Sequence, residues 1–465
     1  MRNKSGIIYK ILIVLFIFTF SFSNAIIIAS NRKKNGITIN LALKNRIKIA
    51  NLTETSEEIK NEQNLIYTNL EKIENIELEE ETEEVDVREI QEEVLATSSN
   101  VEEMELNSRI ALIYDRASGR ILYEKNGNKQ TPMASTTKIM TAIVVLENAN
   151  LKDTVTITSK AAGTGGSRLG LKKDDKITVN DLLYGLMLRS GNDAAVALAI
   201  HIGGSIEGFA QMMNDKAKEM GLTNSHFVVP HGLDNEGHYT TAYELAKMAD
   251  YALNVAKFKE IVSCQTATIY INGYAKVINN TNQLLGSVSG VYGVKTGFTN
   301  GAGRCLVSSC KRDDLDIITV IIGADTTKMR TADTIKLIQY AYENFEIINI
   351  KEIVDRKLEQ WLDVNQGRIY VNKGIKNNVE LLLDELDFET MAVKKTDVDK
   401  VEIEVNSIFY LEAPVSKNQV IGNAKVTLNG EVIDILQMCA KEEIRKKEMQ
   451  DYLVEFMLLI KSITG

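Results

Sequence analysis

A serine and a lysine stand three residues apart at the head of an apolar stretch, TPMASTTKIMTAIVVLENA, which runs from Thr131 to Ala149. Side chains with this spacing lie on one face of a helix, so Ser135 and Lys138 are predicted to be neighbours. A serine hydroxyl is a poor nucleophile unless a base lies beside it. The pair can therefore be a nucleophile with its base, or a helix cap next to a surface lysine.

A lysine can act as a base only if its pKa is lowered. Burial and a nearby second cation both lower the pKa of an amine. The apolar residues that follow Lys138 would bury it, and Lys295 would be the second cation if the fold brought the two together. Arginine could not take this role, because it does not lose its proton in proteins.

Two further short motifs follow the Ser-x-x-Lys motif in order. Ser-Gly-Asn at 190–192 interrupts a helical pattern, and Lys-Thr-Gly at 295–297 lies inside a predicted strand. Each motif is weak alone: Ser308 and Lys311 repeat the first one, although on a strand these two side chains would point to opposite faces. The ordered combination is specific, and it is known from penicillin-binding proteins and class A β-lactamases.

Three histidines lie close together in NSHFVVPHGLDNEGHYTT, namely His226, His231 and His238. A catalytic zinc site needs three such ligands, often with a carboxylate. The HExxH spacing is absent, and so is the Gly-x-Ser-x-Gly motif of other serine hydrolases. Turn and cap roles are therefore favoured for these residues, and neither a metal nor a cofactor is predicted.

The elements around the motifs predict an α+β fold. Two strand-like runs joined by a turn, RIALIYD and RILYEKN, precede the Ser-x-x-Lys helix, and two more strands, GRCLVSSCKR and LDIITVIIGAD, follow Lys-Thr-Gly. Helices lie between them, and TADTIKLIQYAYENF closes the domain. This order predicts an antiparallel sheet flanked by helices over residues 107–347. Period-two alternation predicts a second, smaller β-rich domain over 348–438.

The segments ahead of the catalytic region have a different composition. Residues 1–29 place basic residues before an apolar run, as in a secretory signal peptide, and the run is also nearly long enough for a membrane anchor. Residues 30–106 contain one aromatic residue, and the stretch 54–105 holds 19 acidic residues against three basic ones. This composition predicts a flexible acidic spacer, with a structured acidic helix as the alternative.

The end of the chain, residues 439–465, carries an amphipathic pattern in EIRKKEMQDYLVEFMLLIKSITG. The segment is too short to span a bilayer, so it would lie on a membrane surface or pack on a protein surface. The four cysteines are too few for a disulfide scaffold. Cys305 and Cys310 would point to opposite faces of a strand and are not expected to pair. No basic stripe indicates a nucleic-acid partner.

From about Ser108 onward the chain resembles the low-molecular-mass penicillin-binding proteins, which are serine-type D-alanyl-D-alanine carboxypeptidases. The resemblance is carried, in order, by LIYDRASGRILYEKN, MASTTKIMTA, LKKDDKITVNDLLYGLMLRSGNDAAVALA, VPHGLDNEGHYTTAYELA and GVKTGFTNGAGRCLV. It implies a penicillin-binding/β-lactamase-like catalytic domain, followed by the β-rich domain and the terminal amphipathic helix. The signal-like segment at 1–29, whether cleaved or retained, predicts that the bulk of the protein lies outside the cytoplasm, in the cell envelope at the outer face of the cytoplasmic membrane.

The same resemblance implies the residue roles. Ser135 would be the nucleophile and Lys138 its base. Ser190 would relay a proton to the leaving amine, and Asn192 would orient Lys138 and the substrate.

On the strand, Lys295 and Thr296 would hold the terminal carboxylate of the substrate. The backbone N–H groups of Ser135 and Phe298 would form the oxyanion hole. The strand with Lys295, Thr296 and Gly297 would also pair with the extended peptide.

The implied substrate is a peptidoglycan stem peptide that ends in D-Ala-D-Ala, and β-lactam antibiotics would acylate the same serine. Water attacking the acyl-enzyme gives a carboxypeptidase, whereas an amine gives a transpeptidase. The Glu-x-x-Leu-Asn motif of class A β-lactamases is absent between Asn192 and Lys295, which argues against a lactamase. The alternatives are a DD-transpeptidase or endopeptidase, and a non-catalytic wall-binding or morphogenetic protein.

Overall fold

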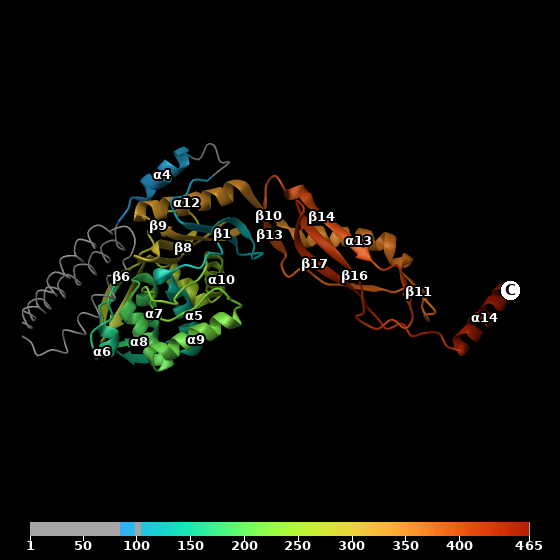
Figure 1. Ribbon diagram of the computed structural model, residues 1–465, viewed down its shortest axis with the longest axis horizontal. Helices are drawn as coiled ribbons and strands as arrows, with labels where there is room; N and C mark the ends of the chain where they lie inside the picture. The colour runs from blue at the N-terminus through green and yellow to red at the C-terminus, as the bar shows by residue number, and fades with distance from the viewer. Residues whose placement is uncertain (1–83, 98–103, 465) are drawn as a thin grey trace, which may run out of the picture. The chain divides into compact units, whose positions relative to one another are not determined.

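Figure 1 shows the computed structural model of the chain, which describes residues 84–97 and 104–464. The chain forms two compact units. The first runs to Leu112 and also contains Glu124–Ser309 and Thr319–Ile335. The second contains Ile113–Tyr123, Cys310–Ile318 and the chain from Lys336 onward. The predicted signal peptide or anchor at 1–29 lies outside the described residues. Residues 30–83 and 98–103 of the predicted spacer also lie outside them.

The central sheet is antiparallel and has the strand order β2-β1-β9-β8-β7. Its strands are β1 (Ile110–Asp115), β2 (Ile121–Lys125), β7 (Val291–Thr299), β8 (Gly303–Arg312) and β9 (Leu315–Ala324). Every residue of β1 and nearly every residue of β9 is buried, on both faces of the strand. Such continuous apolar runs are expected where helices cover both faces of a sheet, and Figure 1 shows α12 (Thr327–Asn344) on one face and the other helices on the opposite one.

The helices that cover the other face surround the Ser-x-x-Lys and Ser-Gly-Asn motifs. They are α5 (Lys138–Asn148), α6 (Ser159–Ala162), α7 (Val179–Leu188), α8 (Asn192–Gly203), α9 (Ile206–Glu219), α10 (Ala242–Leu253) and α11 (Ala256–Ser263). Hydroxyl caps fix where several of them begin: the side chains of Thr178, Ser205 and Thr241 accept backbone N–H groups of the first turns of α7, α9 and α10.

A smaller sheet with the order β3-β4-β5-β6 lies in the same unit. Its strands are β3 (Thr154–Thr156), β4 (Lys176–Thr178), β5 (Thr266–Ile271) and β6 (Tyr274–Asn279). β5 and β6 form a hairpin whose turn is Asn272-Gly273, with both residues at positive φ. This dipeptide is the usual sequence of a two-residue hairpin turn, because both of its residues tolerate that conformation.

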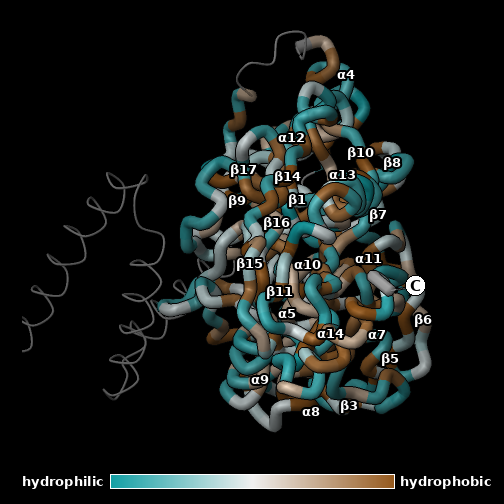
Figure 2. The backbone as a smooth tube through the Cα atoms, turned by 90° about the vertical axis from the view of Figure 1, so that its right-hand side faces the viewer, coloured by the Kyte–Doolittle hydropathy of each residue, from teal (hydrophilic) through white to brown (hydrophobic). Residues whose placement is uncertain are grey.

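The second unit contains the predicted β-rich domain, which is confirmed. Its main sheet has the order β12-β17-β16-β14. Figure 2 shows teal and brown alternating along β14 and β16, and the burial of β14 alternates in the same way. The strands and helices of this unit are β10 (Phe345–Asn349), α13 (Ile350–Asn365), β11 (Tyr370–Asn372), β12 (Leu381–Leu383), β13 (Thr390–Lys394), β14 (Val401–Ser407), β15 (Tyr410–Glu412), β16 (Val420–Leu428), β17 (Glu431–Ala440) and α14 (Met449–Thr464), with 3₁₀ turns at Gln366–Arg368 and Val398–Lys400.

Helix α13 was not anticipated from the sequence. It buries Ile350, Val354 and Leu358, which stand four residues apart, against the main sheet of the second unit. This spacing places all three side chains on one face of a helix. Among the described residues, no helix is both long and apolar enough to cross a membrane.

Residues 84–97 do not extend away from the catalytic unit as the predicted flexible spacer would. Residues Val87–Thr97 form helix α4, which buries Val87, Ile90 and Val94. The Asp86 carboxylate accepts the N–H groups of Arg88 and Glu89 and so caps the helix. The low overall hydrophobicity of this segment hid three apolar residues with helical spacing.

Two polar contacts hold α4 on the first unit. The Val85 N–H donates to Gln283 Oε1 at 3.2 Å, and Lys328 at the start of α12 pairs with Glu93 at 3.0 Å. Figure 1 shows α4 lying beside α12. An exposed ion pair contributes at most about 1 kcal/mol, so burial of the three apolar side chains accounts for most of the docking.

The docking of α4 can be tested by placing a charge in its buried face. Ile90→Asp should release residues 84–97, because a buried unpaired carboxylate is unfavourable. Limited proteolysis followed by mass spectrometry should then show new cuts between residues 84 and 106, with the near-ultraviolet circular dichroism unchanged. Leu95→Asp, at a position of the same helix that is half exposed, should remain as resistant as the wild type. Equal resistance of both variants would contradict the docking.

Candidate active site

Ser135 and Lys138 meet at the start of α5. Ser135 lies in a 3₁₀ turn, η1 (Ala134–Thr137), and Lys138 is the first residue of the helix that continues it. Side chains three residues apart eclipse one another in a 3₁₀ helix, and Lys138 Nζ lies 2.9 Å from Ser135 Oγ. The lysine is fully buried and the serine is 7% exposed. The predicted neighbours therefore make a direct hydrogen bond in a site shielded from water.

Lys138 Nζ has two further partners, and both are oxygen acceptors. It lies 2.7 Å from Asn192 Oδ1 and 2.8 Å from the backbone oxygen of His231. The Asn192 amide is oriented by its own donor, because Nδ2 donates to the Gly165 backbone oxygen at 2.8 Å. Three oxygens thus surround the Lys138 nitrogen inside the protein.

Ser190 lies between α7 and α8, where the sequence predicted a break in the helical pattern. Its φ of 58° is in the left-handed region, which is unfavourable for a residue with a Cβ atom. Its hydroxyl is fully buried and has no hydrogen-bond partner among the described residues. A strained residue with an unsatisfied buried hydroxyl is typical of functional sites.

The Asp193 carboxylate holds the loop that faces Ser190 and Asn192. It accepts the backbone N–H groups of Leu169, Gly170 and Leu171 at 2.8–2.9 Å. The Asn192 N–H in turn donates to the Ser167 oxygen at 2.7 Å. These bonds fix the backbone on both sides of the motif, so the strained φ of Ser190 is imposed by its surroundings.

Strand β7 carries the Lys-Thr-Gly motif against η1, the turn that contains Ser135. A Cβ atom on Gly297 would lie 2.9 Å from the backbone nitrogen of Ser135, so only glycine allows this approach. Lys295 is buried, and its Nζ donates to the Thr296 oxygen at 2.8 Å. The hydroxyls of Thr296 and Thr281 lie 2.6 Å apart. Phe298, which follows Gly297 in the chain, stacks on the Arg304 guanidinium.

The loop with the three histidines supports η1 and α5 from another side. In this loop the backbone oxygen of His231 accepts a hydrogen bond from Lys138 Nζ. The sequence could not predict this contact, because every residue has a backbone oxygen. Gly232, at a φ of +88°, leaves room for η1, since a Cβ atom there would lie 1.9 Å from the Ala134 oxygen. The Thr141 hydroxyl ties α5 to this loop by donating to the Pro230 oxygen at 2.6 Å.

Two histidines of this loop are buried, and burial lowers the pKa of each. The pKa of His231 falls to about 3, and that of His238 falls to about 4. His238 Nδ1 accepts the Val228 N–H, so its proton lies on Nε2, which faces the Thr137 hydroxyl at 2.8 Å. In the described part of the chain no group of three or more His, Cys, Asp and Glu side chains could hold a metal ion.

Because folded His238 takes up a proton only near pH 4, whereas an unfolded histidine does so near 6.5, the unfolded state binds more protons between these values. The free energy of unfolding should therefore fall as the pH decreases from 7, with His238 alone contributing about 2 kcal/mol of this loss by pH 5. His238→Gln removes this titrating group. The free energy of unfolding of the wild type minus that of the variant should therefore be about 2 kcal/mol smaller at pH 5 than at pH 7. Urea unfolding at pH 7 and pH 5 measures it, and an equal difference at both pH values would refute the assignment.

The fold and the three converging motifs define a serine acyl-transfer enzyme of the penicillin-binding class. The sequence matches the family D-alanyl-D-alanine carboxypeptidase (peptidase S11) over residues 95–326, and the penicillin-binding protein 5 C-terminal domain over 362–446. The chain belongs to the peptidase S11 family of low-molecular-mass penicillin-binding proteins.

Two curated relatives and one solved structure illustrate the similarity. The chain is 33% identical over 370 residues to the D-alanyl-D-alanine carboxypeptidase DacF of Bacillus subtilis, covering 76% of this chain and 90% of the relative. It is 30% identical to DacC of Escherichia coli, covering 78% and 91%. The crystal structure of penicillin binding protein 5 from Haemophilus influenzae matches with a TM-score of 0.62 at 28% identity, covering 75% of this chain and 100% of that one.

These similarities confirm the predicted fold and activity. The protein is a serine-type D-alanyl-D-alanine carboxypeptidase with a β-rich C-terminal domain. Membership of the family implies a D-Ala-D-Ala peptide substrate, penicillin binding and a location in the cell envelope outside the cytoplasm.

Proposed function

We propose that Ser135 is the nucleophile of this carboxypeptidase and that neutral Lys138 is its base. The observation that carries the proposal is the set of partners around Lys138 Nζ. A neutral amine has two N–H groups and one lone pair. Asn192 Oδ1 and the His231 oxygen can only accept, so they take the two N–H groups. The lone pair is then left for the hydroxyl of Ser135, as deprotonation of the nucleophile requires.

The surroundings of Lys138 favour this neutral form. Full burial removes the water that would stabilise an ammonium. A second buried lysine, Lys295, lies on the strand that packs against η1. Two cations enclosed in one protein interior raise the cost of each other's charge.

In the proposed reaction, Ser135 Oγ attacks the carbonyl carbon between the two D-alanines of a stem pentapeptide and gives its proton to Lys138. The C–N bond then breaks, and the amine of the terminal D-alanine leaves with a proton delivered through Ser190. Water hydrolyses the resulting ester and restores the serine. Support for the relay is the buried Ser190 hydroxyl, which has no partner among the described residues.

The remaining roles follow from the position of β7. We assign the oxyanion hole to the N–H groups of Ser135 and Phe298, and the substrate's terminal carboxylate to Lys295 and Thr296. Gly297 supports this assignment, because its missing side chain lets β7 approach the backbone of Ser135. Preorganised backbone donors of this kind stabilise the charge that develops in the transition state.

Labelling with a fluorescent penicillin tests the nucleophile. Wild-type protein should give a labelled band on a denaturing gel, and Ser135→Ala should abolish it, because no oxygen remains to form the ester. Ser308→Ala is the matched control: it belongs to the second Ser-x-x-Lys sequence, and its buried hydroxyl donates to the Gly293 oxygen instead. A labelled Ser135→Ala band would disprove the assignment. Release of D-alanine from a pentapeptide, without cross-linked product, separates hydrolysis from transpeptidation and from a non-catalytic role.

We also propose that α14 holds the protein on a membrane surface. Its apolar side chains are about half or more exposed, namely Met449, Leu453, Val454, Phe456, Met457, Leu458, Leu459 and Ile460. Exposed apolar surface of this extent is rare on soluble domains unless it serves an interaction. The helix is short and carries Lys461 in its last turn, which suits an orientation parallel to an anionic lipid surface.

Co-sedimentation with anionic lipid vesicles tests the membrane role. The double variant Phe456→Glu and Ile460→Glu should reduce the bound fraction at least tenfold, because burial of two large apolar side chains is lost and two charges are added. Val432→Glu with Ile435→Glu, two exposed positions on β17, is the matched control and should bind like the wild type. Equal binding of the first pair would argue against α14 as the anchor.

A further inference from the structure

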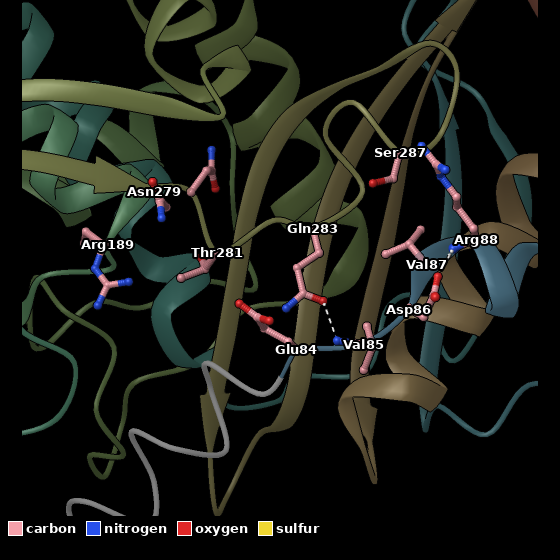
Figure 3. Close-up of a pocket in the computed structure, with 11 residues that line it drawn as sticks. Glu84, Val85, Asp86, Val87, Arg88, Arg189, Asn279, Thr281, Gln283 and Ser287 are labelled. Carbon is pink, nitrogen blue, oxygen red and sulfur yellow. Dashed lines mark hydrogen bonds between the residues drawn. The ribbon is translucent and has the colours of Figure 1, made fainter.

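A cavity of about 710 Å³ lies between the start of α4 and the catalytic motifs. One wall is the stretch 84–88, and the other residues that line it are Arg189, Asn279, Asn280, Thr281, Gln283 and Ser287. Figure 3 shows the Val85 N–H bonded to Gln283 at this wall. The segment that the sequence assigned to a spacer therefore forms one wall of an open cavity in the catalytic unit.

Two of the lining residues connect the cavity to the proposed site. Thr281 shares a 2.6 Å hydrogen bond with Thr296, to which we assign the substrate's terminal carboxylate. Arg189 directly precedes Ser190, to which we assign the proton relay to the leaving amine. This hydrogen bond, together with the position of Arg189 next to Ser190 in the chain, places the cavity on the leaving side of the scissile bond, next to the residue that the reaction releases.

The cavity is larger and more charged than an alanine requires. The methyl group of a leaving D-alanine would fill only a small part of 710 Å³. Four charged side chains line the space, namely Glu84, Asp86, Arg88 and Arg189, and the Asp86 carboxylate already caps α4. In Figure 3 the Glu84 and Arg189 side chains lie on either side of Thr281, with the Glu84 carboxylate directed toward it.

We propose that this cavity is a subsite for the side chain of the residue that leaves, and that Glu84 makes it favour a side chain ending in an ammonium group. The proposal rests on the proposed function. The α-carboxylate of the leaving residue is held by Lys295 and Thr296, as assigned above, and Thr281, which shares a hydrogen bond with Thr296, lines the cavity beyond it. Glu84, across Thr281, then faces the far end of the side chain and pairs with its cation.

The chemistry is the acyl transfer already described, with a different leaving group. Ser135 forms the ester, the C–N bond breaks, and the departing amine belongs to a D-residue with a long basic side chain instead of to D-alanine. Such a residue ends a single peptide, with its α-amine in the bond that breaks and its side-chain ammonium free. Binding energy from a remote part of the substrate raises kcat/KM when it is retained in the transition state.

Three acyl-D-Ala-X peptides test the subsite, with X being D-alanine, D-lysine or D-norleucine, and kcat/KM is measured for release of X. Wild type should cleave the D-lysine peptide at least as well as the D-norleucine peptide. Glu84→Gln should lower the D-lysine to D-norleucine ratio about threefold, since one partly exposed ion pair is lost, and should leave the D-alanine value unchanged. Glu92→Gln, an exposed position of α4 outside the cavity, is the control and should keep the wild-type ratio.

A ratio that does not change in Glu84→Gln would overturn the proposal, as would wild-type protein that releases D-alanine but neither of the larger residues. Failure of the proposed function is distinguishable from both, because D-alanine itself would then not be released and Ser135→Ala would still be labelled by penicillin. Faster release of D-lysine than of D-norleucine by the wild type, lost in Glu84→Gln and kept in Glu92→Gln, supports the subsite.

Discussion

The candidate active site depends on one buried nitrogen atom and the oxygens around it. Lys138 Nζ contacts the Ser135 hydroxyl, the Asn192 amide oxygen and the His231 backbone oxygen, each within 2.9 Å. These three partners come from η1, the start of α8 and the histidine loop. A buried amine needs all of its hydrogen-bonding capacity satisfied, so the fold must bring three separate segments to one point. The surrounding structure can be understood as the means of doing so.

Glycines and backbone carbonyls make that convergence possible. Gly297 lets β7 lie against η1, and Gly232 lets the histidine loop approach the same turn from another side. The Asn192 amide is oriented by the Gly165 oxygen, and Asp193 pins the neighbouring loop through three backbone N–H groups. Much of the site's precision thus lies in backbone atoms, which hold their positions with little loss of side-chain entropy.

The division of the site between side chains and backbone atoms explains what the sequence could and could not predict. The candidate residues were predicted because their types and order are characteristic, namely Ser135, Lys138, Ser190, Asn192 and the Lys-Thr-Gly strand. The His231 oxygen could not be found, since no side chain marks it. An acidic helix was only the alternative for the segment that contains α4, because the four charged residues of this helix outnumber its three buried apolar ones. Helix α13 was missed because its residues were included in the β-rich domain predicted from residue 348 onward. In both helices, the apolar spacing carried the information that the average composition concealed.

The docking of α4 also fixes where the preceding chain meets the catalytic unit. That chain arrives at Glu84, beside the cavity on the leaving side of the site, and not at the far end of a segment continuing to residue 106. Each residue of extended chain spans about 3.3–3.6 Å, so residues 84–97 would span roughly 46–50 Å if they were extended, and they are instead folded onto the unit. The cavity wall is therefore only as stable as the packing of α4: a change that undocks this helix would also open the cavity.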